Sequence, residues 1–189
     1  PITADRSKIR FNQTSFSAAL YGQANWNINE DWTLTLGARV SYEEKEADSS
    51  QQFDSTGIFF MQFLGQEEYV VDGSREEINF APKVSLRYHI NDDMTAYATV
   101  AQAFKGGGFN TAAAQADEFE FDQEEAITYE LGYKSKFMGG LFRANFAAFW
   151  TDFDNLQVSV FDGTKFVVLL LPVWLIVFAV PFSIVCQLF

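Results

Sequence analysis

The sequence predicts an all-β fold: an antiparallel transmembrane β-barrel fragment of about six strands in three hairpins, followed by a C-terminal apolar tail. Three observations predict it. Apolar and polar residues alternate along several segments. The links between these segments are alternately short and long. Aromatic residues make up 17% of the chain although its net charge is −12, which indicates residue types sorted between two faces and not blocks of one type.

The first hairpin comes from residues 15–43. Residues 15–28 alternate with a period of two, which is typical of a strand with one apolar face. Residues 29–31 have turn composition, and the alternation restarts at Trp32 and runs to residue 43. The apolar positions of the two segments are Phe16, Ala18, Leu20, Gly22, Ala24, Trp26 and Ile28, then Trp32, Leu34, Leu36, Ala38, Val40 and Tyr42.

Two further hairpins follow the same plan. Residues 80–90 alternate, residues 91–93 form a turn, and a weaker strand runs from Met94 to Phe104. Residues 127–137 alternate, Met138, Gly139 and Gly140 form the third turn, and residues 142–150 return. The links 44–77 and 105–124 are long and strongly acidic. Short turns at one rim and long loops at the other are typical of outer-membrane barrels. The acidic residues either are solvated or bind divalent ions that bridge lipopolysaccharide.

The spacing of aromatic residues fits a membrane. Trp32 and Tyr42 lie on one face, ten residues apart, which is roughly 33 Å along a strand. Tilted by about 45°, this distance projects to about 23 Å, close to the ~25 Å apolar band between the aromatic girdles of a barrel. The alternative is that both residues pack in the core of a soluble sandwich.

Residues for other chemistry are few. An acidic chain does not suit nucleic acid. His89 is the only histidine and Cys186 the only cysteine, so the sequence predicts no catalytic triad, no zinc site and no internal disulfide. Gly106, Gly107 and Gly108 lack the Gly-Lys-Ser/Thr ending of a phosphate loop. We therefore expect no enzyme activity and no cofactor.

Several motifs, in their order, resemble TonB-dependent receptors, the outer-membrane barrels that import iron chelates and other nutrients. The motifs are Phe104-Lys105-Gly106-Gly107-Gly108-Phe109-Asn110, Tyr129-Glu130-Leu131-Gly132-Tyr133-Lys134-Ser135 and Phe149-Trp150-Thr151-Asp152-Phe153-Asp154-Asn155-Leu156-Gln157, with weaker matches at Leu36-Gly37-Ala38-Arg39 and Phe80-Ala81-Pro82-Lys83. The resemblance covers roughly residues 10–165. No plug domain or coupling motif of the family is recognisable, so we expect energy coupling to lie outside this chain.

The resemblance implies a fragment of an outer-membrane receptor for energy-coupled import, with an iron–siderophore complex as the most frequent cargo of the family. Its implied partners are outer-membrane lipid and lipopolysaccharide, an energy-transducing periplasmic protein and an iron chelate. Charged residues of the polar strand faces would line the barrel interior, where they contact the plug or cargo or only keep the lumen wet. These candidates are Arg39, Lys83, Arg87, Glu130 and Lys134.

The tail divides the chain into residues 1–165, a partial barrel, and residues 166–189, which do not match the family. Residues 166–185 contain no charge and no alternation. About twenty apolar residues can span a bilayer as a helix, with Pro172 and Pro181 as kinks. Three interpretations stay open: an aberrant end such as a shifted reading frame, an inner-membrane anchor, or a buried hydrophobic strand or hairpin. With an anchor, the chain is either retained in the inner membrane or is a soluble β-meander tethered there, the rival function.

Overall fold

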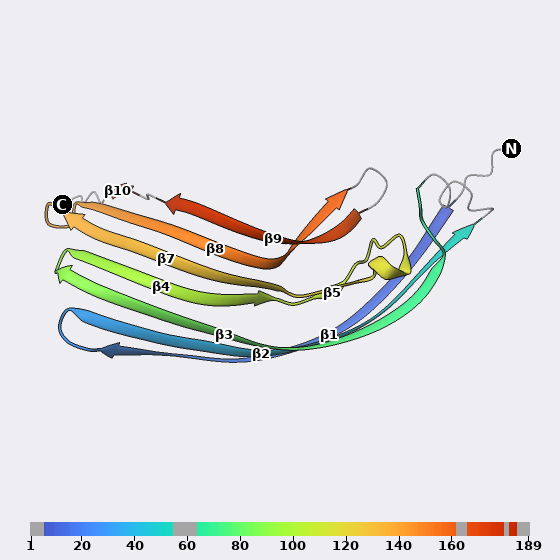
Figure 1. Cartoon of the computed structure of the whole chain (residues 1–189), viewed down its shortest axis with the longest axis horizontal. Coiled ribbons are helices and arrows are strands. Elements are labelled where there is room, and N and C mark those ends of the chain that lie inside the picture. Colours follow the sequence, from blue (N-terminus) through green and yellow to red (C-terminus); the bar gives the residue numbers. More distant parts are fainter. Residues whose placement is uncertain (1–5, 55–63, 162–165, 180–181, 185–189) are drawn as a thin grey trace, which may run out of the picture.

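A computed structural model describes residues 6–54, 64–161, 166–179 and 182–184, and they form one large antiparallel sheet (Figure 1). Its strands are β1 (Arg6–Asn27), β2 (Trp32–Asp54), β3 (Tyr69–Asn91), β4 (Met94–Lys105), β7 (Glu124–Phe137), β8 (Phe142–Phe161), β9 (Phe166–Ala179) and β10 (Phe182–Ile184). They pair in the order β1-β2-β3-β4-β7-β8, and both β9 and β10 pair with β8. The three predicted hairpins are therefore confirmed.

The tight turns lie together at one end of the sheet (Figure 1). The Asn29 side chain accepts hydrogen bonds from the backbone N–H groups of Asp31 (2.9 Å) and Trp32 (2.8 Å), which closes the first turn. Asn91 accepts one from the N–H of Asp93 at 3.0 Å in the second turn. In the third, Met138 has a φ of 54°, and Gly139 (67°) and Gly140 (89°) extend the left-handed backbone.

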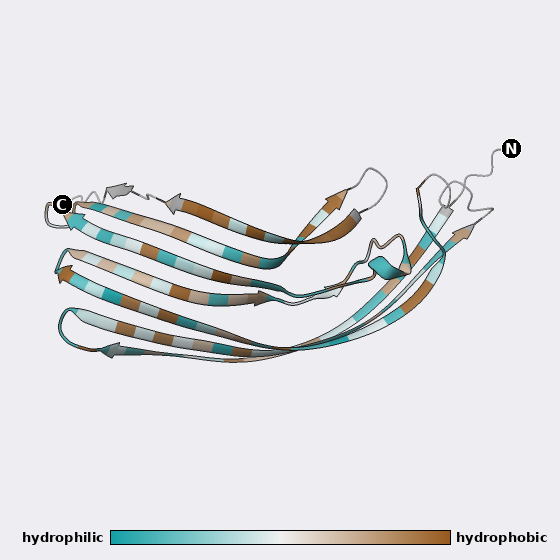
Figure 2. Ribbon diagram, in the orientation of Figure 1, coloured by the Kyte–Doolittle hydropathy of each residue, from teal (hydrophilic) through white to brown (hydrophobic). Residues whose placement is uncertain are grey.

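The register keeps the two predicted faces continuous across the sheet. Trp32 lies opposite Tyr88, Tyr88 opposite Ala96, Ala96 opposite Tyr133 and Tyr133 opposite Phe146, so one row of mostly aromatic residues crosses five strands. The rings of Trp32 and Tyr88 stack with centroids 4.6 Å apart. We call this side the apolar face and the opposite side the polar face. The alternation of colours along the strands in Figure 2 follows this arrangement.

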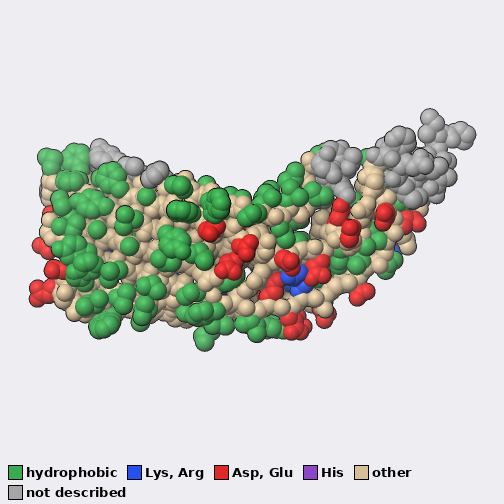
Figure 3. All heavy atoms as spheres, in the orientation of Figure 1, with side chains coloured by type: hydrophobic (Ala, Val, Ile, Leu, Met, Phe, Trp, Pro, Cys, Tyr) green, Lys and Arg blue, Asp and Glu red, His purple; other side chains and the backbone are tan. Residues whose placement is uncertain are grey.

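No second layer of described residues covers the apolar face. This favours the aromatic girdle of a membrane barrel over the core of a soluble sandwich. The described residues form only one further sheet, of β5 (Gly108–Phe109) and β6 (Glu120–Phe121), and it lies on the other side. Large side chains such as Leu20 and Trp26 stand mostly exposed on the apolar face. Figure 3 shows hydrophobic side chains spread over the half of the sheet next to the tight turns, and acidic side chains with basic ones among them toward the other end.

The predicted link 44–77 is mostly not a loop. Strands β2 and β3 continue through residues 43–54 and 69–77. Residues 43–51 pair with residues 69–77, and β1 pairs with β2 as far as Arg6 and Asp54. We call residues 6–17, 43–54 and 69–77 the extension. A strand of 22 residues reaches roughly 70 Å, far more than the ~25 Å apolar band requires. The extension therefore projects beyond the band. Residues 55–63 of the link lie outside the described residues.

The tail forms a strand, so a helical anchor at residues 166–179 is wrong. β9 pairs antiparallel with the edge of β8, from Phe161–Phe166 to Ala147–Ala179. β-Branched and aromatic residues favour an extended chain, and Pro172 falls where the register shifts between Phe153–Val173 and Leu156–Leu171, so its missing N–H breaks no regular pair. Inner-membrane retention thus loses the element on which it rested. No helix among the described residues is long and apolar enough to cross a membrane.

Candidate functional site

The polar face is held by hydrogen bonds between opposite side chains. Thr35 donates to Asn25 (2.8 Å), Ser85 and Thr99 share a bond of 2.7 Å, and Thr128 and Thr151 share one of 2.9 Å. These pairs follow from the register, because directly opposite residues of an antiparallel ladder point to the same side. The face is therefore polar and ordered, as a surface that lines an aqueous interior must be.

Tyr97 joins two of the predicted site residues. Its hydroxyl donates to Glu130 at 2.5 Å, and the Lys134 ammonium lies 5.3 Å from the centroid of its ring. The ring covers Gly132, its partner in the β4–β7 ladder, where an added Cβ would lie 2.2 Å from ring carbon Cζ. Glycine at residue 132 therefore lets the ring lie flat against the sheet.

The other predicted residues are on the polar face but apart. Arg87 lies opposite Tyr97 in the ladder, Lys83 opposite Gly37, and Arg39 opposite Ala81. Within the described part of the chain, no side-chain hydrogen bond or ion pair involves Arg39, Lys83 or Arg87. Sequence reasoning missed Tyr97, because β4 alternates weakly and the Tyr97–Gly132 pairing depends on a register that no local pattern fixes.

We predict that Gly132→Val destabilises the sheet by displacing the Tyr97 ring. The expected loss is roughly 1–3 kcal/mol of unfolding free energy, typical of overpacking, measured by denaturant titration of the full-length receptor in lipid. In a Tyr97→Ala background the same valine should cost much less, because the ring that covers Gly132 is then absent. An equal cost in both backgrounds would contradict the account.

A folded loop closes over the polar side of the extension. Residues 106–123, which we call the 106–123 loop, contain β5, β6 and a short 3₁₀ helix, η2 (Ala116–Glu118). Phe109 and Phe119 pack with ring centroids 4.9 Å apart, and together with Ala47 of β2 they form a small core against Phe11 and Val71. Ala47, Phe11 and Val71 lie on the polar side by register, so the loop folds inward.

Two further contacts fix the middle of this loop. The Tyr69 hydroxyl donates to the carbonyl of Ala113 (3.0 Å), and the Gln115 amide donates to the carbonyl of Gly65 (3.3 Å). Glycine at residue 73 leaves room for Phe109, whose ring atom Cε1 would lie 2.6 Å from an added Cβ. The predicted link 105–124 is thus an ordered inward fold.

Arg75 is the electrostatic anchor of the loop. Its guanidinium forms an ion pair with Glu77 of its own strand (3.1 Å). It also forms ion pairs with Glu120 (2.5 Å) and Asp122 (3.1 Å) of the 106–123 loop. Burial lowers the pKa of Arg75, but its hydrogen bonds to Asp122, Glu77 and Glu120 outweigh that and raise the pKa above its ordinary value. Arg75 is therefore a permanent cation that binds the acidic loop to the sheet.

Lys45 and Glu77 hold the start of the loop. Lys45 pairs with Glu43 (3.0 Å) and donates to the carbonyl of Gly107 (2.6 Å), while the N–H of Gly107 donates to both carboxylate oxygens of Glu77 (3.2 Å each). The Gln157 amide of β8 donates to the carbonyls of Gly106 (3.1 Å) and Asp122 (3.0 Å). The Gly107 backbone thus bonds two charged side chains, and the Gly106 backbone bonds the uncharged Gln157 amide.

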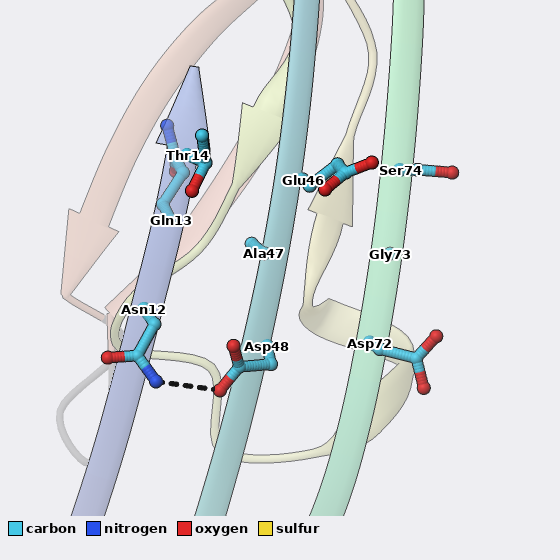
Figure 4. A pocket seen from close by; sticks show the side chains of 9 residues that line it. All are labelled: Asn12, Gln13, Thr14, Glu46, Ala47, Asp48, Asp72, Gly73 and Ser74. Atoms are coloured by element: carbon cyan, nitrogen blue, oxygen red, sulfur yellow. Dashed lines mark hydrogen bonds between the residues drawn. The ribbon is translucent and has the colours of Figure 1, made fainter.

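The outward side of the extension carries an acidic hollow of about 360 Å³ (Figure 4). Glu46, Asp48 and Asp72 line it, and the Asn12 amide donates to Asp48 at 2.9 Å. Among the described residues, no group of three or more acidic, histidine or cysteine side chains is placed to hold a metal ion. Divalent bridging to lipopolysaccharide therefore stays a hypothesis without a formed site behind it.

Comparison with known proteins decides the family. Residues 1–172 match the family described as TonB dependent receptor-like, beta-barrel. The chain belongs to the TonB-dependent receptor family. Its members are transport receptors of the outer membrane and not enzymes. The predicted division at residue 165 stays a prediction.

The relatives of this TonB-dependent receptor chain are much longer. It is 26% identical over 146 residues to the pesticin receptor of Yersinia pestis. The aligned region covers 77% of this chain and 20% of that protein. It is 24% identical over 151 residues to the ferric-pyoverdine 358 receptor of Pseudomonas putida, covering 80% of this chain and 16% of that protein. The chain thus spans about a fifth of the length of the curated relatives it matches.

Solved structures show the same fold. The ferric yersiniabactin uptake receptor FyuA of Yersinia pestis superposes with a TM-score of 0.68 at 22% identity, over 80% of this chain and 22% of that one. The siderophore receptor PiuA of Acinetobacter baumannii superposes with a TM-score of 0.59 at 22% identity, over 82% of this chain and 21% of that one. At this identity the likeness concerns the fold.

Proposed function

We propose that this chain is a wall segment, with part of the extracellular entrance, of an outer-membrane receptor that imports ferric siderophores. The observation that carries the proposal is the 106–123 loop, which folds inward over the polar face at the end opposite the tight turns. An ordered loop over a polar interior suits capture of a solute from outside. No covalent chemistry is required of the chain.

The names of the relatives supply the cargo class. The pyoverdine receptor and PiuA are named for siderophores or their ferric complexes. In the whole receptor, a plug would release the cargo and an energy-transducing periplasmic protein would drive the release. Outer-membrane lipid would cover the apolar face, and lipopolysaccharide would surround the base of the extension. The polar-face residues Arg39, Lys83, Arg87, Glu130 and Lys134 would meet the plug or the cargo.

Uptake of radioactive iron tests this function. Cells that express the full-length receptor, and cells from which its gene is deleted, would be given ⁵⁵Fe as ferric enterobactin, ferric citrate, ferripyoverdine, ferric yersiniabactin or ferrichrome. We expect receptor-dependent uptake of at least one of these chelates, abolished when the proton gradient is collapsed. Equal uptake of all five chelates by both cell types would contradict the proposal.

The side of the outer membrane that the 106–123 loop and the tight turns face gives a separate prediction. Thr111 is exposed on the 106–123 loop and Asp92 is exposed in a tight turn. In the full-length receptor, Thr111→Cys should react with a membrane-impermeant thiol reagent on intact cells, whereas Asp92→Cys should react only after the outer membrane is opened. Gln51 is unsuitable as a probe of the outside because it is only 1% exposed and its amide donates to the carbonyl of Glu67. Labelling of Asp92→Cys on intact cells would invert the topology.

A further inference from the structure

A second hollow lies on the polar face at the base of the 106–123 loop. Its volume is about 680 Å³, and residues of β1, β2, β3, β4 and the start of the loop line it. Small side chains supply most of its polar-face floor: Ser17, Ala19, Ser41, Ala81 and Ala103. Gly106 of the loop forms one border. The hollow therefore lies between the loop that would meet a cargo first and the interior wall below it.

Asn79 presents an uncommitted hydrogen-bonding side chain to the hollow. It lies opposite Ser41 in the β2–β3 ladder, it lines the hollow, and it is only 9% exposed. Among the described residues, its side-chain amide has no hydrogen-bond partner. In the part of the chain that the structure describes, Ser7 Oγ is the only fully buried side-chain polar atom without a partner, so the Asn79 amide still reaches solvent. It is therefore available to hydrogen-bond an occupant with oxygen or nitrogen atoms.

Arg39 supplies the charge of the hollow. Its guanidinium is exposed and, within the described chain, has no carboxylate partner. Glu43 also lines the hollow, but its carboxylate is already paired with Lys45 at 3.0 Å. The unpaired charge that faces an occupant is therefore positive. A guanidinium beside an amide and serine hydroxyls is the donor set that recognises carboxylate or phenolate oxygens.

We propose that this hollow is a subsite for an anionic, oxygen-bearing group of the imported chelate. Arg39 pairs with the negative charge, and Asn79 donates to an oxygen of the same group. The floor of small side chains lets a flat carboxylate or phenolate ring approach the sheet. The proposal rests on the proposed import function and adds a preference for anionic over uncharged ferric chelates.

Binding to the purified full-length receptor tests the proposal. The probes are ferric enterobactin and ferric citrate, which are anionic, and ferrichrome, which is uncharged. We expect at least one anionic chelate to bind more tightly than ferrichrome. Arg39→Ala should weaken that binding roughly 10- to 100-fold, as loss of a charge-assisted hydrogen bond does. Ala81→Leu should weaken it to a similar extent by filling the floor without changing charge.

Arg10→Ala is the matched control. Arg10 lies on the outward side of the extension, so its replacement removes the same charge without touching the hollow. Chelate binding should be unchanged in this variant. Equal weakening by Arg10→Ala and Arg39→Ala would mean that net charge alone matters, and would overturn the proposal.

The remaining outcomes distinguish failure of the subsite from failure of the import function. If ⁵⁵Fe uptake is receptor-dependent but Arg39→Ala and Ala81→Leu bind chelate as the unchanged receptor does, the subsite is wrong and the import function stands. If Arg39→Ala lowers the unfolding temperature and leaves binding intact, another part of the receptor fills the hollow, which also overturns the subsite. If no chelate is bound or taken up, the import function fails first and the subsite fails with it.

Discussion

Val84→Arg should destabilise the full-length receptor in lipid by about 2–4 kcal/mol, the cost of an arginine on the lipid side of a barrel near the bilayer midplane. Val84 lies on the apolar face between Tyr88, in the aromatic row, and Ile78, at the border of the extension. Leu36 and Val100 lie directly opposite it on the neighbouring strands, so an arginine there would be flanked by apolar side chains. Denaturant titration in lipid vesicles measures the loss.

Ser85→Arg is the matched control for this prediction. Ser85 is the next residue of the same strand but lies on the polar face, where it shares a hydrogen bond with Thr99. Its replacement should cost only about 1 kcal/mol, the value of one neutral hydrogen bond. If the two arginines destabilise the receptor equally, the assignment of the apolar face to lipid is wrong.

Phe119→Ala should release the 106–123 loop from the sheet. Phe119 is 2% exposed and contacts both Phe109 and Phe11, at ring-centroid distances of 4.9 and 6.3 Å. Replacing a buried phenylalanine with alanine costs roughly 3–5 kcal/mol where the site cannot collapse. Because the core beneath this loop is small, we expect the loss to appear as local opening. Hydrogen exchange of the amides in residues 108–121 should become faster by two or more orders of magnitude.

Thr111→Ala controls for a change in the loop itself. Thr111 is exposed and does not belong to the Phe109–Phe119 core, so its replacement should leave the exchange rates as they are. Faster exchange throughout β7 and β8 in Phe119→Ala would indicate a global effect and not an anchored loop. Unchanged exchange in residues 108–121 would show that the aromatic core does not hold the loop.

The hairpins were predictable from sequence because their information is local. A period of two assigns each residue to a face, and a tight turn such as Asn29 to Asp31 fixes the register of the strands it joins. Lys83, Arg87 and Glu130 are therefore on the predicted side of the sheet. The role of these residues in binding stays a prediction.

The extension and the loop above it were not predictable in this way. Residues 43–54 carry acidic or polar side chains on both faces, so their composition resembles that of a loop. Their strand pairing is continued from the hairpin below, and the core that covers them brings together Phe11, Ala47, Val71, Phe109 and Phe119 from distant parts of the chain. No local pattern in the sequence joins these residues.

The tail shows a different reason for failure. Twenty uncharged and almost entirely apolar residues satisfy the length rule for a spanning helix, and that rule ignores neighbouring strands. The exposed edge of β8 offers backbone partners to residues 166–179, and the register shift at Pro172 removes the usual objection to proline in a strand. Long-range pairing decided the structure of this segment.

The most direct test of the central claim, a barrel wall with one face in lipid, is a scan of single cysteines through residues 80–88 of β3 in the full-length receptor. Each cysteine would carry a fluorescent label, and quenching by lipids with a quencher on the acyl chain would be measured. We expect strong quenching at residues 80, 82, 84, 86 and 88 and weak quenching at residues 81, 83, 85 and 87. Quenching that does not alternate with a period of two, or that is stronger at the odd-numbered residues, would contradict this account.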